Sequence, residues 1–198
     1  MSKFRSWLFR GLVVAGGGAM VTSWLLPWWG CWVMVLGNED KVRIYPYGLW
    51  NNLGGWGGIL GDAADMPAFF TPLMWLYLGL CIAALLFAVW KMNKSVRLLG
   101  RNFNLSRLLV GIVGLSYIGI ILGFYFYSKM RVEAFSGMEY VGTTWIEAGI
   151  TTKSYVTSSL RTGFWMAWGV APFLIILALL RNIIVGRPGV VPSGDTSA

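Results

Sequence analysis

Long stretches without a single charged side chain dominate this sequence. They cover residues 11–38, 44–61, 66–90, 108–128 and 162–180. A helix needs about 20 apolar residues to cross the roughly 30 Å hydrocarbon layer of a bilayer, and every stretch except 44–61 suits that role. The stretch 44–61 contains six glycines, which favour turns over a lipid-exposed helix. The sequence therefore predicts four membrane helices, at about 11–27, 71–90, 108–127 and 164–180.

Composition excludes an ordinary water-soluble domain. Hydrophobic residues make up 57% of the chain and charged residues 12%, whereas soluble domains carry roughly 25% charged residues. We expect one integral membrane domain over residues 1–187. Residues 188–198, rich in Pro, Gly and Ser, are expected to form a disordered cytoplasmic tail.

Basic residues are distributed unevenly around the predicted helices. Ten Lys and Arg and only one acidic residue lie in residues 1–10, 91–107 and 181–198. In contrast, six basic and seven acidic residues lie in residues 28–70 and 128–163. The positive-inside rule then predicts cytoplasmic termini and outer loops at 28–70 and 128–163. We expect the membrane to be the plasma membrane. We interpret the net charge of +8 as a topology signal and a contact with anionic lipid, and expect no nucleic-acid site.

Most catalytic and metal chemistry lacks its residues. The chain contains no histidine, and no acidic residue lies inside a predicted span. Haem ligation by His, His-based metal sites, His-centred triads and intramembrane carboxylate relays are therefore not expected, and we predict no enzyme activity, metal or cofactor. Cys31 and Cys81 belong to different levels of the bundle, so we expect no disulfide between them and leave only an intermolecular role for Cys31.

The first outer loop has the pattern of β-strands. The first helix should bend or end near Pro27, because proline lacks a backbone donor and clashes with the carbonyl four residues back. The apolar run 28–36, the turn 37–40 and the alternating residues 41–44 predict a hairpin, and residues 45–50 are expected to continue as strand.

The second outer loop alternates on both sides of Ser136-Gly137, which predicts another hairpin from residues 131–135 and 138–141. An isolated hairpin is only marginally stable, so we expect both loops to join in one sheet over the bundle. The predicted fold is an all-α transmembrane four-helix bundle with a small extracellular antiparallel β-sheet.

Each predicted helix carries small residues four apart. A small-x-x-x-small face lets another helix approach closely, either within the bundle or from a second copy. We favour packing within the bundle because all four helices share the pattern, at Gly11, Ala15 and Ala19, at Gly79 and Ala83, at Gly119 and Gly123, and at Ala167 and Ala171.

A tryptophan at the end of the first helix, Trp28 or Trp29, lies about twenty residues ahead of Gly48, Leu49 and Trp50. Together with the four-span topology, this pattern resembles the claudin superfamily, which includes the PMP22 and EMP proteins. Family members carry a cysteine pair after Gly-Leu-Trp, and residues 51–60 here contain none. The resemblance implies a non-enzymatic protein that associates laterally or between cells through its outer sheet, or serves as an auxiliary subunit.

Two functions remain open at this point. The first is self-association through the outer sheet, with Lys41 and Arg43 of one copy facing Glu133 and Glu139 of the next. The second is an accessory subunit of a channel or respiratory complex. For either function we expect Trp50 to fill the seam between the sheet and the bundle. Expected partners are the lipid bilayer, a second copy or other membrane proteins. A transporter is disfavoured because no ionisable residue lies in a span.

Overall fold

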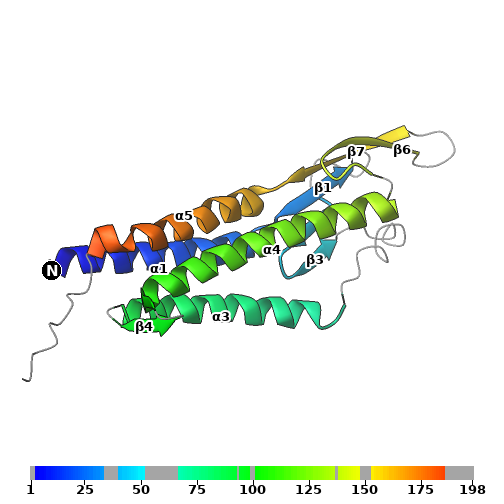
Figure 1. Ribbon diagram of the computed structural model, residues 1–198. Coiled ribbons are helices and arrows are strands. Elements are labelled where there is room, and N and C mark those ends of the chain that lie inside the picture. Colours follow the sequence, from blue (N-terminus) through cyan, green and yellow to red (C-terminus); the bar gives the residue numbers. More distant parts are fainter. Residues whose placement is uncertain are drawn as a thin grey trace, which may run out of the picture.

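Four long helices lie side by side and form the body of the protein (Figure 1). The computed structural model describes residues 3–33, 40–51, 67–92, 94–98, 101–136, 138–147 and 153–185. All four helices are long and apolar enough to cross a membrane. This confirms the four predicted helices, which span α1 (Lys3–Leu25), α3 (Phe70–Trp90), α4 (Leu105–Ser136) and α5 (Thr162–Val185).

A five-stranded antiparallel sheet covers one end of the helices, which we call the sheet end. Its order is β3-β2-β1-β7-β6, so β1 at the centre joins the strands of both predicted outer loops. Trp29 of β1 lies opposite Ile44 on one side and Leu160 on the other. The predicted single sheet is thus confirmed, with strands β1 (Trp29–Val33), β2 (Val42–Tyr45), β3 (Gly48–Asn51), β6 (Gly142–Glu147) and β7 (Lys153–Leu160).

The predicted first hairpin is present, but its second strand is shorter than expected. Residues 46 and 47 form a turn, and β3 folds back on β2 with Tyr45 opposite Gly48. Proline at the second position of a four-residue turn and glycine at the fourth are typical of a type I turn, which explains the break at Pro46. The prediction of one strand over 45–50 was therefore wrong.

The predicted hairpin of residues 131–135 and 138–141 was also wrong. Residues 131–136 continue α4, and the strands begin only at Gly142. Phe124, Ser128 and Val132 repeat every four residues along α4 on the side where the helix packs against the sheet, so helical spacing outweighs the short alternation.

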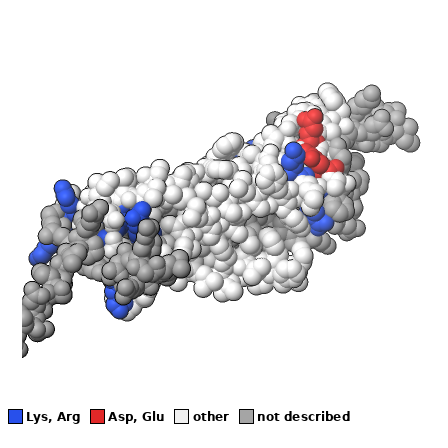
Figure 2. All heavy atoms as spheres, viewed as in Figure 1, with Lys and Arg blue, Asp and Glu red and all other residues white. Residues whose placement is uncertain are grey.

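The opposite end of the helices, which we call the basic end, carries the start of α1 and a short hairpin of β4 (Ser95–Leu98) and β5 (Arg101–Asn104). This hairpin lies within residues 91–107, for which the sequence pattern predicted no strands. Asn104 Nδ2 donates to Asn182 Oδ1 of α5 at 2.8 Å, which holds the hairpin to the bundle. Figure 2 shows charged side chains at the two ends and an uncharged surface between them.

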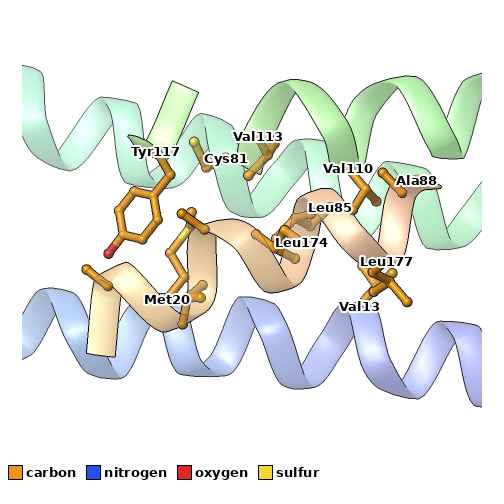
Figure 3. Close-up of a cluster of buried hydrophobic side chains, with 14 of the residues drawn as sticks. Val13, Met20, Cys81, Leu85, Ala88, Val110, Val113, Tyr117, Leu174 and Leu177 are labelled. Atoms are coloured by element: carbon orange, nitrogen blue, oxygen red, sulfur yellow. The ribbon is translucent and has the colours of Figure 1, made fainter. Parts of the chain in front are cut away.

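Two apolar clusters hold the described residues together. The larger one lies among all four helices, where Met20, Leu85, Tyr117 and Leu174 come from different helices and meet (Figure 3). The smaller one lies between the sheet and α4, around Trp29. The partly buried Phe124, Tyr125 and Leu160 pack against both clusters and so connect the sheet to the bundle.

Small residues pack the bundle, but mostly not those predicted. Within α5, Ala167 and Ala171 are fully buried, and Ala19 of α1 is partly buried. Close contacts between helices fall at other glycines, where a Cβ on Gly16 or Gly114 would lie 2.8 Å from a side chain of α5. The remaining predicted positions are exposed, namely Gly11, Ala15, Gly79, Ala83, Gly119 and Gly123. Packing within the bundle was the wrong expectation for these six.

Candidate interaction surface

Trp28 joins the sheet to the bundle. Its ring is fully buried and meets the rings of Trp24, Tyr117 and Phe164 edge to face. The indole Nε1 donates to the Ser23 carbonyl at 2.8 Å, which satisfies its polar atom. Its backbone N–H donates to the carbonyl of Ile44 in β2, and its own carbonyl accepts from the N–H of Arg161 before α5. One residue thus connects α1, the sheet and α5.

Trp29 fixes the sheet to α4. Its Nε1 donates to the Tyr140 carbonyl at 2.6 Å, and the two rings stack with centroids 5.8 Å apart. The Tyr140 hydroxyl lies 2.7 Å from Ser128 Oγ on α4. Burial raises the pKa of Tyr140, so the phenol stays neutral and keeps this hydrogen bond.

Trp50 lies elsewhere than predicted. It belongs to the edge strand β3 together with Gly48 and Leu49, and it is 42% exposed. The Arg43 guanidinium lies over its ring, 5.1 Å from the centroid. Trp28 and Trp29, rather than Trp50, fill the seam between sheet and bundle, so the prediction for Trp50 was wrong.

A cluster of three charges lies on the sheet beside Gly30. Asp40 forms an ion pair with Arg161 through one carboxylate oxygen, and its other oxygen lies 3.5 Å from Arg43 Nε. A Cβ on Gly30 would come within 3.0 Å of Arg161 Nε and 3.1 Å of Asp40 Oδ2. Glycine at this position therefore lets the ion pair pass over β1.

The four predicted self-association charges lie on different parts of the fold. Arg43 pairs with Asp40 in the same chain, and the backbone N–H of Lys41 donates to Cys31. Glu133 lies on helix α4, 3.9 Å from Lys129, and not on a strand. Glu139 is exposed between α4 and β6. The structure gives no support for Glu133 as a strand charge that faces Arg43 of another copy.

Aromatic rings line the sheet face that points away from α4. Trp29, Cys31 and Val33 of β1 are buried toward the helices, so the intervening Trp32 points the other way. Tyr155 of β7 lies between Trp32 and Trp145, with ring centroids 5.6 and 5.5 Å away. Trp145, on the edge strand β6, is 68% exposed. We call Trp32, Tyr155 and Trp145 the aromatic face.

The aromatic face was not predicted from the sequence, because the second pair of strands was expected at residues 131–141 and begins only at Gly142. A usable signal was present, since Thr143, Trp145, Tyr155 and Thr157 alternate with their neighbours in two β-branched and aromatic segments. In the sheet of described residues, β6 and β3 are the two edge strands. The aromatic face therefore extends to an open edge at β6.

The two cysteines are free and buried. Burial raises the pKa of Cys31 to about 12, so its thiol is protonated near neutral pH. This argues against the intermolecular role left open for Cys31. In the part of the chain that the structure describes, no group of three or more His, Cys, Asp or Glu residues is placed to hold a metal ion.

Comparison of the sequence with protein-family models and with curated proteins found no match to either.

Proposed function

We propose that this chain is a non-enzymatic, claudin-like protein of the plasma membrane that associates with further copies of itself through the aromatic face. The four apolar helices support a multi-pass placement. The unequal distribution of Lys and Arg supports a cytoplasmic basic end, with both termini inside and the sheet outside. The pattern of Trp28, Trp29 and Gly48-Leu49-Trp50 supports the resemblance to claudins.

The observation that carries the proposal is the exposure of Trp145 beside Tyr155 and Trp32. Tryptophan and tyrosine bury a large apolar area at a low cost in conformational entropy, and they are enriched among the residues that dominate binding energy. A second copy would cover three neighbouring rings at once. The aromatic face thereby replaces the predicted charge pairs as the main contact.

The open edge of β6 gives the contact a direction. Edge strands present unpaired backbone groups to which another strand can be added. In β6 the residues Thr143, Thr144 and Trp145 are uncharged, and the one charged residue of the strand is Glu147 at its end. Edge pairing would then place the aromatic faces of two copies next to each other.

The test is the oligomeric state in lipid nanodiscs, measured by chemical crosslinking and native mass. We expect oligomers for the wild type, and a dissociation constant raised by roughly tenfold or more for Trp145→Ala, because such anchors typically contribute about 1.4 kcal/mol or more. Trp7→Ala is the matched control, since Trp7 lies on α1 at the basic end and is 70% exposed. A strictly monomeric wild type, or equal effects of both substitutions, would refute self-association through this face.

A second candidate is an accessory subunit of a larger membrane complex. It is favoured by the exposed small residues of α3 and α4, Gly79, Ala83, Gly119 and Gly123, on which a partner helix could pack closely. The same native-mass measurement separates the candidates, because an accessory subunit would be purified with other chains in fixed stoichiometry. Gly79→Leu and Gly119→Leu would then abolish co-purification, whereas Trp145→Ala would not.

A further inference from the structure

Two neighbouring hollows lie along the line where α1 meets α3. At the basic end, a hollow of about 200 Å³ is lined by Arg10, Lys91 and Lys94 together with Trp90 and Met92. Toward the middle of the bundle, a groove of about 220 Å³ is lined only by glycine and aliphatic side chains of the same two helices, among them Val14, Gly18, Val21, Leu86 and Val89.

The two hollows follow each other along the helices. Arg10 and Val14 are four residues apart on α1, which places them on one face, roughly 6 Å apart along the axis. On α3, Val89 of the groove directly precedes Trp90 and Lys91 of the basic hollow. The cationic hollow therefore forms the end of the apolar groove.

The three cationic side chains of the basic hollow favour the binding of an anion. The sequence has no acidic residue between positions 1 and 38 or between 66 and 132, so none near Arg10, Lys91 or Lys94 in the chain can neutralise them. The Arg10 Nε atom is buried, and none of the residues that the structure describes forms a hydrogen bond with it. Lys91 Nζ is held 3.9 Å from the centre of the Trp90 ring, and the Met92 carbonyl accepts a hydrogen bond from Arg181 at 2.7 Å, which steadies the wall of the hollow.

The apolar groove decides between a free anion and a lipid. Gly18 leaves room in the groove, since a Cβ there would meet no atom within 4 Å. From Val14 to Val21 the groove follows α1 for roughly 10 Å at 1.5 Å per residue. A free phosphate would leave this length empty, whereas an acyl chain would fill it. Basic pockets between helices on the cytoplasmic side are suited to lipid headgroups.

We propose that this site binds one anionic phospholipid, with the phosphate in the basic hollow and an acyl chain in the groove between α1 and α3. The inference rests on the membrane placement proposed above and does not depend on self-association. It assigns a ligand to the basic end, where the sequence analysis expected only a general contact with anionic lipid.

The test is native mass spectrometry of the delipidated protein in mild detergent with phosphatidylglycerol and phosphatidylcholine of matched acyl chains. We expect a preference of about tenfold or more for phosphatidylglycerol, lost in Arg10→Gln with Lys91→Gln, because each surface cation contributes about 1 kcal/mol toward anionic lipid. Lys3→Gln with Arg107→Gln is the matched control, since it removes the same charge at the same end but outside the hollow. Equal binding of the two lipids by the wild type would refute the proposal.

The acyl-chain part has its own pair of variants. Gly18→Leu fills the groove and should lower phosphatidylglycerol binding severalfold, whereas Gly169→Leu, at an exposed position of α5 with equal free space and outside both hollows, should leave it unchanged. Soluble glycerol phosphate should fail to displace the lipid at equal concentration. If glycerol phosphate displaces the lipid and Gly18→Leu binds phosphatidylglycerol as well as the wild type does, the site binds only a phosphate, and the lipid proposal is overturned. Trp145→Ala should retain the lipid, which separates this outcome from a failure of self-association.

Discussion

Tryptophan has three different roles at the sheet end, and position decides which one. Trp28 is buried where α1, the sheet and α5 meet. Trp50 lies on an edge strand with the Arg43 guanidinium over its ring, and Trp145 is exposed to solvent. The indole combines a large apolar ring with one N–H donor. Where a backbone carbonyl accepts that donor, as Ser23 does for Trp28, burial leaves no polar group unsatisfied.

Trp28 is expected to contribute most to stability among these residues. Trp28→Ala removes a fully buried ring with several aromatic neighbours and should lower the free energy of unfolding by about 3–5 kcal/mol. Denaturation in mixed detergent micelles measures this. Trp50→Ala is the control and should cost less than about 1.5 kcal/mol, because its ring is already 42% exposed. A larger loss for Trp50 than for Trp28 would contradict this assignment of the seam.

At the scale of elements, the sequence predicted those that a single strong signal defines. The four helices follow from uninterrupted apolar runs, and the end of α1 at Leu25 follows from Pro27. The positions of β6 and β7 could not be predicted in this way, because α4 continues past its apolar stretch as an amphipathic helix that packs on the sheet. Two-residue alternation over five residues cannot outweigh helical spacing that only tertiary packing reveals.

The candidate site was predictable in composition but not in geometry. Tryptophan in the first outer loop indicated a folded layer, yet burial of Trp28 and Trp29 and exposure of Trp145 depend on which strand face packs on α4. The sequence also could not show that Asp40 pairs with Arg161, because these two residues come from distant segments that only the folded sheet brings together.

The ion pair of Asp40 and Arg161 ties the first hairpin to the start of α5. Their side chains are only 15% and 31% exposed, so Asp40→Asn leaves a poorly hydrated arginine without its anion. We expect a loss of about 1–3 kcal/mol in the free energy of unfolding, measured in mixed micelles. The control is Lys129→Gln on α4, whose exposed pair with Glu133 should contribute at most about 0.5 kcal/mol. Equal losses would show that the pair does not hold the two elements together.

At the scale of the whole molecule, charge is divided between two ends that an uncharged middle separates (Figure 2). Residues 28–70 and 128–163, which supply the strands of the five-stranded sheet, hold seven acids and six bases, whereas residues 1–10, 91–107 and 181–198 hold ten Lys and Arg and one acid. The two proposed contacts follow this division. A second copy is expected at the near-neutral sheet, and an anionic lipid at the basic hollow between α1 and α3.

This division also predicts the orientation in the membrane, which single cysteines can test. Val96 lies in the β4–β5 hairpin and Thr143 in β6, at opposite ends of the four helices, and both are exposed. In intact cells a membrane-impermeant maleimide should label Thr143→Cys and not Val96→Cys, because the basic end is expected to stay in the cytoplasm. Both variants should react after lysis, and the wild type should give little background since Cys31 and Cys81 are buried. If only Val96→Cys is labelled in intact cells, the orientation is opposite to the one predicted. The lipid site would then lie outside the cell, and the sheet would lie in the cytoplasm, where it could make no contact between cells.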